Sequence, residues 1–200
     1  MVLRCTARAG TEEKAEALMA PVLREVREIL GDKVYGQDVD SIEAVCLGLL
    51  REKGLTFAAA ESCTGGLIAQ RITELPGASA VFRGGVVSYW SEVKAGVLGV
   101  PQDLLDRYGA VSEPVGRAMA EGVRAITGAE IGLSVTGVAG PDRDDRGNEV
   151  GTVFLTLSAP EGTWCRPMAY GNRRRDTIRG AAASGAFDLL RRYLTGLPIA

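Results

Sequence analysis

The sequence predicts an α/β protein: a three-layer α/β/α sandwich around a mixed sheet, with a small N-terminal β-α-β appendage. Apolar segments of strand length alternate with longer segments whose apolar residues recur every three or four positions, as in strands flanked by amphipathic helices. Two neighbouring strand-like segments, 152–159 and 163–170, are separated by a short turn that contains Pro160 and Gly162. They predict a hairpin, and a hairpin among strands that are otherwise joined by helices gives a mixed sheet.

Residues 1–38 are predicted to form the appendage. A strand is expected at 2–9, a helix capped by Thr11 as far as Gly31, and a return strand at 33–36. Pro21 lies inside the helical pattern and is expected to kink or split the helix. The unit has one apolar face and nothing of its own to bury that face against, so we interpret it as the end of a preceding domain.

Residues 39–200 are predicted to form the main domain. Asp40 and Glu43 make a capping-box pattern at the start of its first helix, which Gly54 ends. The following elements are then expected in chain order: a strand at 55–60, a helix at 64–75, a strand at 84–90, short helices at 91–98 and 101–109, a helix at 112–128, a strand at 130–136, the hairpin, and a helix at 174–194.

The composition argues against several classes of function. The net charge is −2, and the one basic run, at 173–175, is short, so we expect no nucleic-acid partner. No apolar run approaches the ~18 residues of a membrane span. The sequence has no histidine, and its four cysteines form no C-x-x-C pair. We therefore expect a cytoplasmic protein that uses no metal and no cofactor.

Candidate chemistry lies in three segments where a predicted strand ends: "AESCTGG" at 60–66, "SYWSEVK" at 88–94 and "SVTGVAGP" at 134–141. The first segment places Ser62, Cys63 and Thr64 in a row, ahead of two glycines. Such a turn points backbone N–H groups at whatever lies above Ser62, as an oxyanion hole or a phosphate cradle would. The structural alternative is that Ser62 or Thr64 only caps the next helix.

Without histidine no Ser-His-Asp triad is possible, and the base for a nucleophile has to be a lysine, a carboxylate or a tyrosinate. Of the four lysines, only Lys94 follows a core strand. Ser91 and Lys94 also form an S-x-x-K pattern, as in Ser-Lys peptidases, but the same four residues make an ordinary helix start. Tyr89 lies five positions before Lys94, one too many for the Y-x-x-x-K pattern of short-chain dehydrogenases.

Together these segments make the sequence resemble the CinA family, in its C-terminal nicotinamide mononucleotide amidohydrolase domain, over about residues 41–195. Further markers are "LLDRYGAVSEPVGRAMAEGVR" at 104–124, "VGTVFLTLS" at 150–158, and Ile178-Arg179. Residues 1–35 resemble the tail of the linker domain that precedes it in long members. The resemblance implies hydrolysis of the carboxamide of nicotinamide mononucleotide to nicotinic acid mononucleotide and ammonia, without a metal, by a homodimer with a small nucleotide as its substrate.

The family's site residues fall on matching positions of this sequence. The resemblance implies Ser62 as the nucleophile and Lys94 as its base, with Tyr89 in the same site. It implies a substrate-binding role for residues that flank the nucleophile or end later elements: Glu61, Cys63, Thr64, Gly65, Gly66, Thr136, Gly137 and Arg173.

One segment departs from the family pattern. The family usually runs from Ala-Gly-Pro through a glycine-rich loop to Lys-Pro-Val-Gly, whereas residues 142–149 are charged and end in Asn148-Glu149. This departure keeps a second function open, that of a non-catalytic nucleotide-binding or regulatory module of the competence/damage-inducible CinA type.

Overall fold

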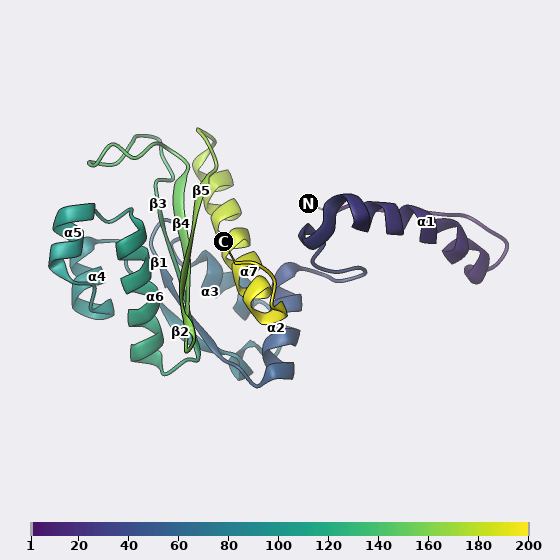
Figure 1. Cartoon of the computed structure of the whole chain (residues 1–200), viewed down its shortest axis with the longest axis horizontal. Helices are drawn as coiled ribbons and strands as arrows, with labels where there is room; N and C mark the ends of the chain where they lie inside the picture. Colours follow the sequence, from purple (N-terminus) through teal and green to yellow (C-terminus); the bar gives the residue numbers. More distant parts are fainter. Residues whose placement is uncertain (1, 200) are drawn as a thin grey trace. The chain divides into compact units, whose positions relative to one another are not determined.

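The computed structural model describes residues 2–199 and divides into two compact units, residues 1–38 and 39–200. The larger unit is built on a five-stranded sheet in the order β2-β1-β3-β4-β5 (Figure 1). Its strands are β1 (Phe57–Glu61), β2 (Phe82–Val87), β3 (Ile131–Gly137), β4 (Thr152–Ala159) and β5 (Gly162–Ala169). The first three strands are parallel, while β4 is antiparallel to β3 and β5 is antiparallel to β4. The predicted mixed sheet and its hairpin are therefore confirmed.

Helices cover both faces of this sheet, which confirms the predicted three-layer sandwich (Figure 1). One layer contains α4 (Ser91–Leu98), α5 (Gln102–Tyr108) and α6 (Glu113–Thr127). The other contains α2 (Ile42–Lys53), α3 (Leu67–Thr73) and α7 (Arg175–Thr195). A 3₁₀ turn, η2 (Ala78–Ala80), joins α3 to β2.

The centre of the sheet is packed closely because its strands carry small side chains. All five residues of β1 are buried, as expected for a parallel strand that is covered on both faces. A Cβ atom at Gly132 of β3 would collide with the carbonyl oxygen of Ala120 in α6, and one at Gly122 of α6 would collide with the carbonyl oxygen of Leu98 in α4. Glycine at these positions lets α4, α6 and the sheet approach until their backbones touch.

The smaller unit differs from the predicted β-α-β arrangement. Helix α1 (Glu12–Leu30) forms with Thr11 as its N-cap, and a 3₁₀ turn, η1 (Gly31–Lys33), follows it. No strand forms at 2–9 or 33–36, because strands need a sheet to pair with and this unit supplies none. The helix is not split at Pro21.

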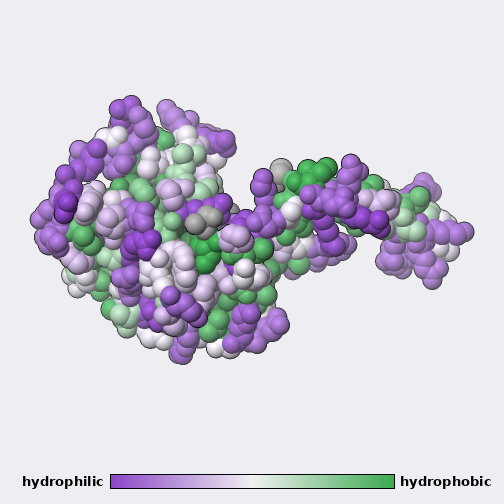
Figure 2. Space-filling model, viewed as in Figure 1, coloured by the Kyte–Doolittle hydropathy of each residue, from purple (hydrophilic) through white to green (hydrophobic). Residues whose placement is uncertain are grey.

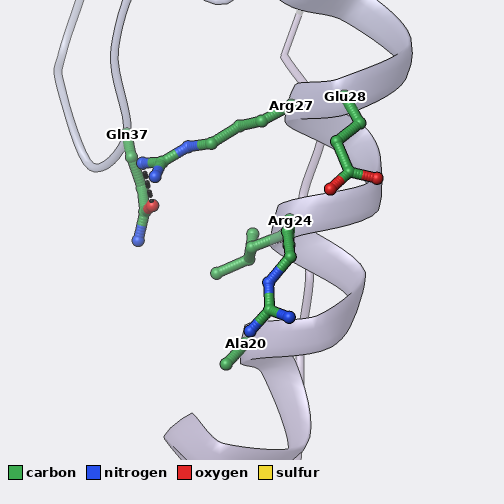
Figure 3. A pocket seen from close by; sticks show the side chains of 6 residues that line it. Ala20, Arg24, Arg27, Glu28 and Gln37 are labelled. Atoms are coloured by element: carbon green, nitrogen blue, oxygen red, sulfur yellow. Dashed lines mark hydrogen bonds between the residues drawn. The ribbon is translucent and has the colours of Figure 1, made fainter.

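Most of the apolar face of α1 is exposed, including Leu18, Val22 and Ile29, and Figure 2 shows hydrophobic surface on this unit. A hollow beside α1 is lined by Ala20, Leu23, Arg24, Arg27, Glu28 and Gln37 (Figure 3). Arg27 spans it and donates a 2.6 Å hydrogen bond from Nη2 to Oε1 of Gln37. The lining of this hollow contains no nucleophilic side chain.

Two helical glycines allow a matched test of the close packing. Gly122→Ala should lower the free energy of unfolding by about 1–3 kcal/mol, because the new methyl group meets the Leu98 carbonyl. Gly48→Ala, in α2, meets nothing within 4 Å and should raise it by about 0.5–1 kcal/mol through helix propensity. Urea unfolding of both variants measures the difference, and two changes of the same sign would contradict this account.

Candidate active site

Ser62 lies directly after β1, and the ladders of both neighbouring strands hold the chain there. The Ser62 N–H group donates a 2.9 Å hydrogen bond to the carbonyl oxygen of Val135 in β3. On the other side, the Ser88 N–H group donates a 2.8 Å bond to the carbonyl oxygen of Glu61. The position of Ser62 is therefore fixed by the centre of the sheet, at the carboxyl ends of three parallel strands.

The chain after Ser62 turns through two glycines that no other residue could easily replace. Gly65 and Gly66 have φ angles of +59° and +94°, in the region that favours glycine. The Gly65 N–H group donates a 3.1 Å bond back to the Ser62 carbonyl, which closes the turn. A Cβ atom at Gly65 would also lie 3.3 Å from Nη2 of Arg179.

Glu61, for which a substrate-binding role is expected, holds the far end of this turn. Its buried carboxylate accepts hydrogen bonds of 3.0, 3.1 and 2.9 Å from the N–H groups of Gly66, Ile68 and Ala69. Glu61 thus caps α3, and neither Ser62 nor Thr64 does so. Through these three bonds Glu61 positions the loop that follows Ser62.

The same bonds restrict which N–H groups could stabilise an oxyanion. Of the four groups at 63–66, that of Gly65 is committed to Ser62 and that of Gly66 to Glu61. The N–H groups of Cys63 and Thr64 donate to no other residue within the described range 2–199. Cys63 itself is buried, and burial raises the pKa of its thiol to about 11, so this side chain stays a neutral thiol beside Ser62.

Lys94 reaches Ser62 from α4. Its Nζ atom lies 3.1 Å from Oγ of Ser62 and 2.5 Å from the carbonyl oxygen of Ser88. The side chain is completely buried, and burial lowers the pKa of the amine from its usual 10.5 to about 8. A neutral amine can donate to the Ser88 carbonyl and still turn its lone pair toward the Ser62 hydroxyl. The Nζ contact is with Ser62 and not with Ser91, which begins the same helix.

Tyr89 directly follows Ser88, whose carbonyl oxygen accepts the Lys94 bond, and its own side chain is bonded to a different residue. Its side chain is half exposed, and its hydroxyl accepts a 2.6 Å hydrogen bond from Nη2 of Arg175. Nη1 of Arg175 donates a second 2.6 Å bond to the carbonyl oxygen of Gly140. Arg175 therefore links the candidate segment at 88–94 to the candidate segment at 134–141.

Arg173, expected to contact the ligand, is exposed, and its side chain makes no hydrogen bond or ion pair with residues 2–199. Arg175, two residues later, is the arginine of this segment that bonds to Tyr89 and Gly140. The sequence does hold a signal for this: Arg175 and Arg179 are four apart in α7 and so share one helix face, whereas Arg173 precedes the helix.

Thr136 and Gly137 end β3, next to the strand position that binds the Ser62 N–H group. The Thr136 hydroxyl donates a 2.7 Å bond to the Ala110 carbonyl, and the residue is buried. At Gly137 a Cβ atom would lie 2.6 Å from Cγ2 of Val153, and glycine is needed for β4 to pair there. Both residues lie at the carboxyl end of β3, which is parallel to and paired with β1, the strand that Ser62 follows.

The charged loop at 142–149 is bonded to α5 and to the connection between α5 and α6. Arg146 donates a 2.6 Å bond from Nη2 to the Asp106 carbonyl, and Asn148 donates a 3.1 Å bond from Nδ2 to the Val111 carbonyl. Asp144 accepts bonds from the backbone and side chain of Asn148, both 2.7 Å long. The loop thus has a defined conformation of its own in place of the glycine-rich pattern.

Two absences apply to the described residues. No group of three His, Cys, Asp or Glu side chains between positions 2 and 199 is arranged to hold a metal ion. Over the same range, no helix combines the length and apolar character needed to cross a membrane.

The depressed pKa of Lys94 predicts a pH-dependent contribution to stability. Between pH of about 8 and 10.5 the unfolded chain holds the lysine proton and the folded chain has lost it, so the free energy of unfolding rises with pH in that window. Below about pH 8 both states hold the proton, and the cost of burying the charge is fully present. Lys94→Met removes this cost, so its stability advantage over the unmodified chain should shrink as pH rises through the window.

Denaturant unfolding at a series of pH values measures this advantage. Lys53→Met, which alters an exposed lysine at the end of α2, is the matched control and should show no such trend. A pH-independent difference for Lys94→Met would contradict the lowered pKa.

Known proteins share both parts of this architecture. The family model of the CinA C-terminal domain matches residues 39–194, and that of the damage-inducible protein CinA KH domain matches residues 1–36. A CinA-like protein of Desulfovibrio desulfuricans is 48% identical over 100% of this chain and 47% of its own length. One from Frankia casuarinae is 52% identical over 98% of this chain and 45% of its own length. The chain thus spans about half the length of these relatives.

Solved structures agree. The competence/damage inducible protein CihA from Agrobacterium tumefaciens has a TM-score of 0.73 at 35% identity, covering 80% of this chain and 99% of that protein. A CinA superfamily protein from Escherichia coli has a TM-score of 0.72 at 28% identity, covering 81% of this chain and 97% of that protein. From these matches, over both of its units, the chain belongs to the CinA family.

Proposed function

We propose that this chain hydrolyses the carboxamide of nicotinamide mononucleotide, giving nicotinic acid mononucleotide and ammonia, without a metal ion. The observation that supports it most is the 3.1 Å contact between Nζ of Lys94 and Oγ of Ser62. In a sequence with no histidine, a buried lysine whose pKa lies near 8 is a base that can activate a serine close to neutral pH. The identity of the amide follows from the family resemblance.

In the proposed mechanism, neutral Lys94 takes the proton of Ser62 as the Ser62 oxygen attacks the carboxamide carbon. The N–H groups of Cys63 and Thr64 donate to the oxygen that gains negative charge. Protonated Lys94 then gives its proton to the departing nitrogen, and ammonia leaves. A water molecule, deprotonated by Lys94, attacks the acyl-enzyme and releases the carboxylate product together with free Ser62.

Arg175 is the residue best suited to the phosphate of the nucleotide. Its planar fork is permanently charged, and its bonds to Tyr89 and Gly140 hold it beside the site. Thr136, at the end of β3, is proposed to bind the phosphoribosyl part of the ligand.

Ammonia release from nicotinamide mononucleotide by the purified chain tests the proposal. Ser62→Ala should abolish release and keep ligand binding, because only the attacking oxygen is removed. Cys63→Ala and Ser91→Ala, the matched neighbours, should remain active. Near-normal turnover by Ser62→Ala would refute the nucleophile, and binding without turnover by the unmodified chain would favour the non-catalytic nucleotide-binding module.

The protonation state of Lys94 should control the rate. The rate should rise with pH through an ionisation near 8, because only the neutral amine can accept the serine proton. Lys94→Arg keeps the charge but cannot lose a proton in this range, so it should lose roughly 100-fold to 10,000-fold in kcat, as Lys94→Ala does. Initial rates from pH 6 to 10 measure this, and an active Lys94→Arg variant would remove Lys94 as the base.

Arg175 and Arg173 provide a matched pair for the phosphate contact. Arg175→Ala should raise KM for the mononucleotide on the order of tenfold to 100-fold, the usual worth of a charged hydrogen bond. KM for nicotinamide riboside, which has no phosphate, should change little. Arg173→Ala should leave both constants near their original values, and equal effects of Arg175→Ala on the two substrates would argue against the phosphate contact.

A further inference from the structure

Arg179, on the inward face of α7, bonds to the loop that follows Ser62. Its Nε atom donates a 3.1 Å hydrogen bond to the carbonyl oxygen of Cys63, and its Nη2 atom donates a 2.6 Å bond to the carbonyl oxygen of Thr64. Two consecutive carbonyl groups are thus held by one planar fork from a different layer of the protein.

These bonds also fix the direction of an N–H group. In a trans peptide unit the carbonyl group and the following N–H group point to opposite sides. Holding the Cys63 carbonyl toward Arg179 therefore turns the Thr64 N–H group away from Arg179. In the same way, the bond from Gly65 to the Ser62 carbonyl fixes the direction of the Cys63 N–H group.

The two N–H groups fixed in this way are those that donate to no other described residue. Cys63 and Thr64 are both buried, and the Thr64 hydroxyl is also without a partner. Polar groups of buried residues are rarely left without a partner, so these N–H groups are suited to an acceptor that a ligand supplies. The carbonyl oxygen of an amide under attack by Ser62 is such an acceptor.

We propose that Arg179 is a positioning residue for the oxyanion: it clamps the Cys63–Thr64 peptide unit and keeps its N–H group directed at the reacting amide. The cation at the carbonyl end also polarises this peptide unit, which strengthens its N–H group as a donor. Arg179 itself does not touch the substrate. The inference rests on the proposed function, in that it takes Ser62 to be an acylated nucleophile.

Two assays separate the clamp from the identity of the substrate. The first is ammonia release from nicotinamide mononucleotide. The second is the labelling rate of Ser62 by a fluorophosphonate, in which the Ser62 oxygen bonds to phosphorus, fluoride leaves, and the serine proton passes to Lys94. This reagent needs the nucleophile, the base and the N–H donors, but no nucleotide contact.

Arg179→Ala should lower kcat and the labelling rate by roughly 10-fold to 100-fold, somewhat less than the removal of an oxyanion donor. Nucleotide affinity, measured in a Ser62→Ala background, and the ionisation near pH 8 should both be unchanged. Guanidinium ion at non-denaturing concentrations should restore part of the rate. Arg179→Lys should stay impaired, because an ammonium group lacks the planar fork.

Ser184→Ala is the control, since it removes the 3.0 Å bond between α7 and Arg71 of α3 without touching the loop. The clamp is refuted if Arg179→Ala labels at the original rate, if guanidinium does not rescue it, or if Ser184→Ala is equally slow. A chain that labels at Ser62 but releases no ammonia would refute the proposed substrate, and the ratio of labelling rates would still decide the role of Arg179. Failure of the unmodified chain to label would refute both.

Discussion

The site depends on one buried amine. Lys94 is enclosed by the domain and bonds only to Oγ of Ser62 and the carbonyl oxygen of Ser88 among its described neighbours. No carboxylate faces it, so burial dominates and its pKa falls to about 8. A nearby carboxylate would restore the charge and remove the lone pair that a base needs. The surrounding structure therefore has to exclude water without supplying an opposite charge.

Close packing meets that requirement. Lys94 is in the middle of the short helix α4, whose last carbonyl groups press against Gly122 of α6, and α6 in turn lies against Gly132 of β3. Small residues therefore bring the backbones of α4, α6 and the sheet together, and the amine is completely buried. Ser62 is held as firmly as Lys94. Its N–H group bonds to Val135 of β3, and the N–H group of Ser88 bonds to the preceding residue, Glu61. The two groups meet because the fold fixes both backbones, at a cost in charge burial that the large core of this domain can offset.

Much of this could be predicted from the sequence, because the relevant signals are local or follow from strand order. The spacing of apolar residues predicts the helices and strands of the larger unit, with ends displaced by a few residues. The three candidate segments lie close together because each follows the carboxyl end of a parallel strand. The expectation of strands at 2–9 and 33–36 was wrong, because the pattern of apolar residues does not show whether a strand has a partner to pair with. Which of Arg173 and Arg175 bonds to Tyr89 depends on where α7 begins, because successive helical residues point about 100° apart. The capping role of Glu61 depends on side-chain direction, which residue spacing does not encode.

The unusual loop at 142–149 acts on the site through a shared segment and not through direct contact with the Ser62–Lys94 pair. Arg146 and Asn148 bind the carbonyl groups of Asp106 and Val111, and the Ala110 carbonyl between them accepts the bond from Thr136. The stretch from 106 to 111 is therefore held on one side by the loop and on the other by the end of β3. Within the loop, Arg143 also forms an ion pair with Glu149. The bonds of its polar side chains thus hold the loop in place, and through the stretch from 106 to 111 they support the strand end that carries Thr136.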